Sequence, residues 1–135
     1  MAKSVFDKFR ARQEYLLVYS ELLTAARYRG VVTYQHLAKL IGLPLKGSYM
    51  GSQIGQYLGA ICEAEHRLKR PLLSAVAVSS KDSPGPGFYG VASYLGRFRG
   101  GTREQERAFW LAEREAVYAV WKPVFPERVK GAPRA

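Results

Sequence analysis

The chain has 135 residues, of which 47% are hydrophobic and 24% charged, a balance that fits one soluble domain and excludes disordered and membrane-spanning classes. Lysine and arginine number 21 against 11 acidic residues, which gives a formal net charge of +10 at pH 7. A single cysteine, Cys62, excludes an intramolecular disulfide and a cysteine-based zinc site. The positive charge places nucleic acid first among the expected partners.

Apolar spacing predicts a long helix over residues 5–28. Its expected buried stripe comprises Phe9, Leu16, Tyr19, Leu23 and Ala26. A short β-branched piece at residues 31–32 follows, and Thr33 is then placed to cap a helix over residues 34–41.

The central prediction is a pair of helices separated by a turn. Gly42 and Pro44 end the first helix, and the second runs from Ser48 to about residue 69. The buried face of the second helix is expected to hold Ile54, Leu58, Ile61, Cys62 and Leu68. Its opposite face is expected to hold Ser52, Gln56, Glu63, Arg67 and Arg70. This arrangement is a helix-turn-helix.

The second half of the sequence predicts one buried strand and two further helices. The strand covers residues 72–79, and a loop at 81–87, a helix at 88–95 and a basic link at 97–101 follow. Thr102 and Gln105 form a capping box for a helix that ends near residue 121. The expected fold is mainly α (α+β), with one winged-helix-like domain and a short sheet over residues 1–126. A basic flexible tail is expected at 127–135.

The second central helix is suited to DNA contact. In a helix-turn-helix this helix enters the major groove, where hydroxyl and amide side chains bond base edges or phosphates. Lys46, in the turn, is placed for a phosphate contact. The expected reading side chains are Ser48, Tyr49, Ser52, Gln53 and Gln56. The competing interpretation is an ordinary helical hairpin within a core.

Three glycines, Gly51, Gly55 and Gly59, recur every four residues along this helix. Each costs about 1 kcal/mol relative to alanine in a helix interior, so something should compensate. The two interpretations are close packing of another element and close approach of a nucleic-acid backbone. Under the first, Gly55→Ala would unfold the protein; under the second, it would mainly weaken binding.

Two basic clusters supply further expected phosphate contacts. The denser cluster comprises Arg97, Arg99, Arg103 and Arg107. The other comprises Arg67, Lys69 and Arg70. Phe98 lies within the denser cluster, where it could stack on an unpaired base if it is exposed. The alternative is a solvated link that Phe98 anchors to the core.

No complete catalytic signature occurs in the sequence, and we expect no catalytic residue, metal ion or cofactor. His66 and Glu63 share one helical turn, but no second histidine follows at metal-ligand spacing. Asp82 follows the predicted strand without carboxylate partners. Residues 85–87 could hold a phosphate at a helix N-terminus, although the lysine of a P-loop is missing. A non-catalytic role is therefore favoured.

The stretch R-G-V-V-T-Y at residues 29–34 begins a longer pattern of apolar residues and glycines. The later positions of the pattern are Leu37, Ala38, Gly42, Pro44, Ile54 and Gly55. Over this part the chain resembles the winged-helix C-terminal domain of alkylguanine-DNA alkyltransferases and alkyltransferase-like proteins. The resemblance implies DNA binding with Tyr34 near the DNA. Alkyl transfer is not implied, because residues 71–74 replace the family's Pro-Cys-His-Arg strand and its arginine finger has no equivalent.

Two other functions fit the same sequence. One is a protein-interaction module, such as an inhibitor or assembly factor in a phage or bacterial defence setting, that docks through exposed Tyr89, Tyr94 and Phe98. The other is an enzyme acting on nucleic acid or a nucleotide, with a pocket at residues 80–88. The leading prediction is a non-catalytic DNA-binding protein. It is expected in the cytoplasm and without a membrane partner, because the sequence lacks a bilayer-length apolar run and a signal-peptide core.

Overall fold

The computed structural model describes residues 4–44, 48–79 and 83–123, so the predictions for Lys46, Asp82 and the tail lie outside the described residues. The protein is mainly helical, with one short parallel sheet. Its elements in chain order are α1 (Asp7–Arg10), α2 (Gln13–Arg27), β1 (Val32–Thr33), α3 (Tyr34–Leu40), α4 (Ser48–Arg67), η1 (Leu73–Val76), β2 (Ala77–Val78), α5 (Pro86–Tyr94) and α6 (Arg103–Trp121).

The predicted N-terminal helix is in fact two helices. Arg12 has an extended backbone, with a ψ of 149°, and this residue separates α1 from α2. The helix therefore restarts at Gln13 with a different buried stripe. The buried residues of α2 are Tyr15, Val18, Leu22 and Ala26. The prediction for Leu16 was wrong, since this residue is 67% exposed.

The predicted strand at residues 72–79 is mostly a 3₁₀ helix, η1. Only β2 is extended, and it pairs in parallel with β1, Ala77 opposite Val32 and Val78 opposite Thr33. Every residue from 72 to 78 is buried, as predicted. A short apolar run predicts that a segment is buried, but it does not distinguish a strand from a helix. The strand prediction for residues 73–76 was wrong for this reason. The described residues contain no antiparallel hairpin of the kind that forms a wing.

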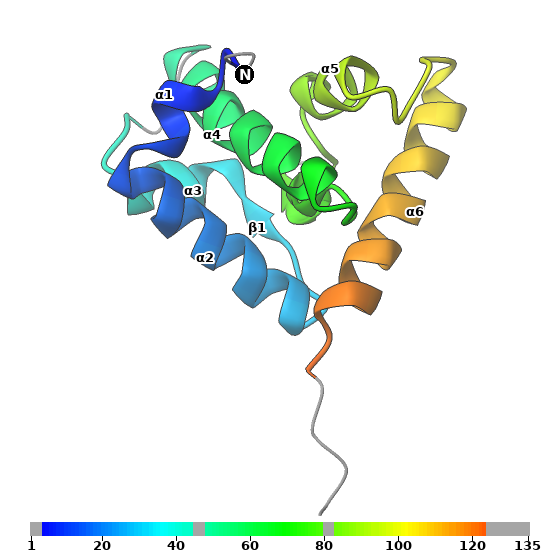
Figure 1. Ribbon diagram of the computed structural model, residues 1–135, viewed down its shortest axis with the longest axis horizontal. Helices are drawn as coiled ribbons and strands as arrows, with labels where there is room; N and C mark the ends of the chain where they lie inside the picture. Colours follow the sequence, from blue (N-terminus) through cyan, green and yellow to red (C-terminus); the bar gives the residue numbers. More distant parts are fainter. Residues whose placement is uncertain (1–3, 45–47, 80–82, 124–135) are drawn as a thin grey trace, which may run out of the picture.

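The helices surround this buried segment. α2, α4 and α6 all pack against η1, and α2 and α6 converge at their C-terminal ends (Figure 1). There Arg29 lies 3.0 Å from Glu115, and the Tyr118 hydroxyl donates to the Gly30 carbonyl at 2.7 Å. None of the helices within the described ranges combines the length and hydropathy needed to cross a bilayer.

The helix caps predicted at Thr33 and Thr102 are confirmed. The Thr33 hydroxyl accepts the His36 amide N–H at 3.1 Å at the start of α3. Thr102 and Gln105 form the complete capping box of α6. These local signals were readable from the sequence because each cap involves residues only three positions apart.

A buried glutamate joins α4 to the segment that follows it. Glu65 has no exposed surface, and its carboxylate accepts hydrogen bonds from Arg70 Nε at 2.7 Å, from Arg70 Nη2 at 2.9 Å and from the Tyr19 hydroxyl. Burial and the bond to Glu65 raise the pKa of Tyr19 to about 12. The hydrogen bonds to Glu65 also raise the pKa of Arg70. Tyr19, Glu65 and Arg70 therefore form one hydrogen-bonded group that joins α2, α4 and the residues that follow α4.

A second glutamate of α4 corrects the predicted polar face. Glu63 is only 4% exposed. Its carboxylate accepts hydrogen bonds from Arg10 at 2.6 Å and from the Ser4 hydroxyl at 2.8 Å, so it ties α1 to α4. The helical wheel placed it toward solvent because the segment that covers it comes from the far N-terminus of the chain.

Removing the partner of the buried carboxylate should be costly. Arg70→Met removes the cation bound to the buried Glu65 carboxyl group, and we expect the free energy of unfolding to fall by about 2–4 kcal/mol, discounted for the partial exposure of Arg70. Arg67→Met is the control: Arg67 is 55% exposed and lies 3.6 Å from Glu63, and its loss should cost under about 1 kcal/mol. Urea unfolding at pH 7 measures both values. Equal losses in the two variants would contradict this assignment.

Candidate nucleic-acid interface and ligand pocket

The N-terminal half of α4 separates two concave surfaces. One is an open groove of about 430 Å³. It is lined by Arg12, Glu14, Ile41, Leu43, Tyr49, Gln53 and Tyr57. The other is a more enclosed pocket of about 410 Å³, to which α4 contributes Gly51, Ser52 and Gly55. Residues four apart share one helix face, so the predicted reading side chains are divided between the two surfaces.

Arg12 is the cation of the groove, and the sequence analysis missed it. Its guanidinium lies 4.6 Å from the centre of the Phe9 ring and donates to the Tyr57 hydroxyl at 3.2 Å. The bond to Tyr57 raises the pKa of Arg12. Two of the predicted reading residues, Tyr49 and Gln53, lie in the same groove. No sequence signal identified Arg12, because it reaches the groove at the break between α1 and α2, where the apolar spacing predicts continuous helix.

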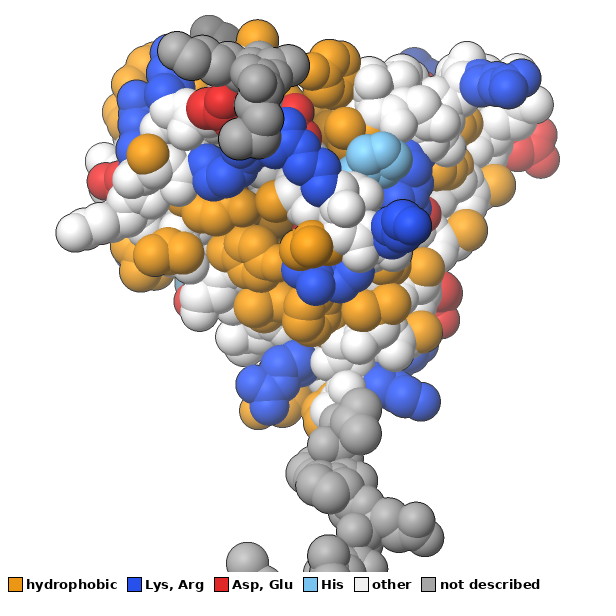
Figure 2. All heavy atoms as spheres, viewed as in Figure 1, with side chains coloured by type: hydrophobic (Ala, Val, Ile, Leu, Met, Phe, Trp, Pro, Cys, Tyr) orange, Lys and Arg blue, Asp and Glu red, His pale blue; other side chains and the backbone are white. Residues whose placement is uncertain are grey.

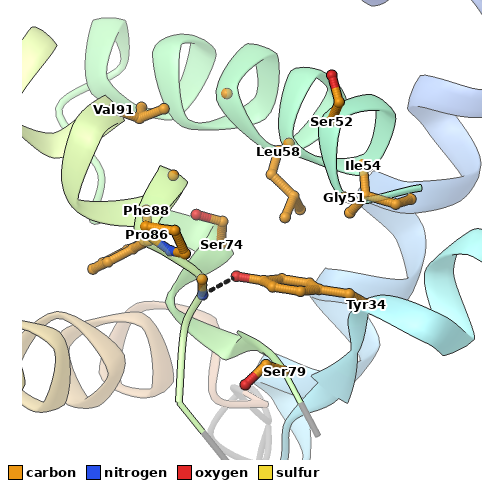
Figure 3. Close-up of a pocket in the computed structure, with 14 residues that line it drawn as sticks. Tyr34, Gly51, Ser52, Ile54, Leu58, Ser74, Ser79, Pro86, Phe88 and Val91 are labelled. Carbon is orange, nitrogen blue, oxygen red and sulfur yellow. Dashed lines mark hydrogen bonds between the residues drawn. The ribbon is translucent and has the colours of Figure 1, made fainter. Parts of the chain in front are cut away.

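The remaining predicted reading residues do not enter this groove. Ser52 is exposed at the rim of the pocket, and its hydroxyl points away from Tyr34 (Figure 3). Gln56 is half-buried and lines neither surface. Ser48 begins α4, and its side chain lies outside the described part of the structure.

Tyr34, which the family resemblance places near DNA, forms part of the pocket wall. Its hydroxyl accepts the Gly85 amide N–H at 2.6 Å, a contact across 51 positions of sequence. Burial raises the pKa of Tyr34, so the phenol stays protonated at neutral pH. A Cβ on Gly85 would lie 3.0 Å from the Tyr34 ring, so a side chain there would crowd the phenol.

Two of the predicted phosphate contacts are engaged within the protein. Arg70 is bound to Glu65, as described above. Arg97 lies 3.1 Å from Glu113 and donates to the Arg70 carbonyl at 3.3 Å. Both arginines hold the buried segment in place, and their charge is already paired within the protein.

The other predicted arginines are spread over the molecule. Arg99 and Arg103 are exposed beside the start of α6, whereas Arg67 ends α4, about 28 Å along the helix from Ser48. Figure 2 shows Lys and Arg side chains scattered over one face, with apolar side chains between them. On this face the positive charge is therefore spread over separate places rather than gathered in one patch.

Phe98 anchors the link between α5 and α6. Its ring stacks on Phe109 with centroids 4.7 Å apart and lies 5.9 Å from Tyr89. Phe98 and Tyr89 are partly buried against the core, whereas Tyr94 is 65% exposed. Tyr89, Tyr94 and Phe98 therefore do not form one exposed aromatic patch, and that prediction was wrong.

The three glycines of α4 have different surroundings. A Cβ on Gly59 would lie 2.5 Å from the Phe6 ring, so close packing explains this glycine. A Cβ on Gly51 or Gly55 would have no atom within 4 Å among the described neighbours. The packing interpretation therefore holds for Gly59. It fails for Gly51 and Gly55, which border the more enclosed pocket.

The pocket walls carry hydroxyl groups from Tyr34, Ser74 and Ser79. The Ser74 hydroxyl lies 2.9 Å from the Cys62 sulfur, and burial raises the pKa of that thiol to about 11, which keeps it protonated. Cys62 is a core residue, as expected. Within the described residues no three metal-ligating side chains come together.

Comparisons with known proteins gave no match to any protein-family model, curated protein or solved structure.

The different surroundings of the glycines lead to a measurable contrast. Gly55→Ala should raise the free energy of unfolding by about 0.5–1 kcal/mol, because it favours the helix and meets no neighbour. Gly59→Ala should lower it by about 1–2 kcal/mol, because the methyl group displaces Phe6. Thermal and urea unfolding measure both changes. Destabilisation by Gly55→Ala would show that another element packs on this glycine.

Proposed function

We propose that this protein binds duplex DNA without catalysing a reaction, with α3 and α4 as a helix-turn-helix in a winged-helix-like domain. The observation that supports this proposal is the groove in which Tyr49 and Gln53 lie beside Arg12. An aromatic hydroxyl, an amide and an oriented guanidinium are groups that bond base edges and phosphates. The proposed partner is nucleic acid, and the proposed compartment is the cytoplasm.

The arrangement of charge also supports the proposal. Most acidic side chains of the described part lie in ion pairs with arginines. The pairs are Asp7 and Glu63 with Arg10, Glu65 with Arg70, Glu113 with Arg97, and Glu115 with Arg29. The described cations that have no carboxylate within ion-pair distance include Arg12 of the groove together with Lys8, Lys39, Arg99 and Arg103. The positive charge of these side chains is available to phosphates.

The groove is tested by removing its cation. Arg12→Gln should weaken binding to a fluorescent duplex about three- to tenfold at low salt and reduce the salt slope by roughly one contact. Arg27→Gln removes the same charge from the other end of α2, where the side chain is also exposed, and should have a smaller effect. Fluorescence anisotropy at two salt concentrations gives both values. Absence of binding at low salt, or equal effects of the two variants, would refute the proposed interface.

Phosphate contact and base reading can be separated with a second pair of variants. Because exposed cations outnumber the candidate readers, we expect Arg99→Ala to weaken binding to all sequences about equally and to reduce the salt slope by roughly one. Gln56→Ala should have little effect on any sequence, since this half-buried residue lines neither concave surface. The measurement compares a selected duplex with a scrambled one. A loss with Gln56→Ala on the selected duplex alone would show direct base reading.

A further inference from the structure

The pocket on the second face of α4 takes no part in the proposed DNA contact. Ile54 and Leu58 point into it from α4, and Phe88 and Val91 border it from α5 (Figure 3). Tyr34 extends along its other side toward the residues that precede α5. Its volume of about 410 Å³ falls within the range of roughly 300–1,000 Å³ that is usual for small-molecule sites.

The residues that line the pocket disfavour a charged ligand. The described residues that line the pocket include no lysine, arginine, histidine, aspartate or glutamate. A charged ligand would lose its hydration there without gaining a counter-ion, which is strongly unfavourable. The apolar side chains instead favour a ligand that is mainly hydrocarbon.

The hydroxyl groups of Tyr34 and Ser74 are polar groups in this otherwise mainly apolar lining. Because the Tyr34 oxygen accepts the Gly85 N–H, its own hydrogen is free of any described acceptor and is available for donation. Ser74, only 4% exposed, has the Cys62 sulfur as its side-chain partner, which is a weak one. A ligand acceptor would give the Tyr34 hydrogen a partner and would offer the Ser74 hydroxyl a stronger partner than the thiol.

Glycines of both α4 and α5 border empty volume in the pocket. A Cβ placed on Gly51 or Gly55 of α4, or on Gly87 of α5, has no described atom within 4 Å. No described side chain therefore occupies the volume that these glycines border, although each position has room for one.

We infer that this pocket binds an uncharged, mainly apolar small molecule that carries a hydrogen-bond acceptor, which the hydroxyls of Tyr34 and Ser74 recognise.

The uncharged dye N-phenyl-1-naphthylamine, whose fluorescence rises in apolar surroundings, tests the pocket in the full-length protein. Wild-type protein should bind the dye saturably. Gly55→Leu should fill the pocket and weaken binding by about tenfold or more. Gly90→Leu is the matched control, because Gly90 is also helical with an open Cβ position but lies outside the pocket.

Circular dichroism should show that both leucine variants fold, and Gly51→Leu repeats the test from a second position if Gly55→Leu does not. Failure of the wild type to bind, unchanged binding by the pocket variants, or equal loss in the Gly90→Leu control would overturn the inference.

The acceptor is tested with prodan, an uncharged naphthalene that carries a carbonyl group. Tyr34→Phe should weaken prodan binding about three- to tenfold and leave the binding of N-phenyl-1-naphthylamine unchanged, since only prodan offers a carbonyl acceptor for the lost hydroxyl. Equal effects on both dyes would show that Tyr34 shapes the pocket without recognising an acceptor.

Discussion

The structure depends on burying one short segment completely. Residues 72–78 expose almost no side-chain surface, so their backbone polar groups must find partners inside the protein. Distant residues supply them: Glu113 of α6 accepts the Leu72 N–H at 2.7 Å, and the Trp110 indole donates to the Ala75 carbonyl at 2.9 Å. The position of α6 against the rest of the fold is set by these bonds together with the packing of its apolar face on η1.

The same constraint explains why much of the positive charge is not available for binding. Arg70 and Arg97 flank the buried segment, and both are held by carboxylates of low exposure, Glu65 and Glu113. Leaving either carboxylate without its arginine would bury an unpaired charge. A basic residue near a nucleic-acid interface therefore contributes to that interface only if the core does not already require it.

α4 combines three roles along its length. Its C-terminal half belongs to the core, where Ile61, Cys62 and Glu65 are buried. Its N-terminal half carries Tyr49 and Gln53 on one face and the glycines Gly51 and Gly55 on another. Since helical periodicity separates these faces, the same two turns can border a polar groove and an apolar pocket without competition between them.

The sequence by itself determined the helical class, the caps at Thr33 and Thr102, and the burial of residues 72–78, because propensity, capping and apolar content act over a few neighbouring positions. It could not determine which arginines pair with buried carboxylates, or that Tyr34 meets Gly85. It also could not separate Gly59, which packs on Phe6, from Gly55, which faces open space. Tertiary structure decided these points, because each is a contact between segments far apart in the chain, and spacing along one helix says nothing about what lies opposite it.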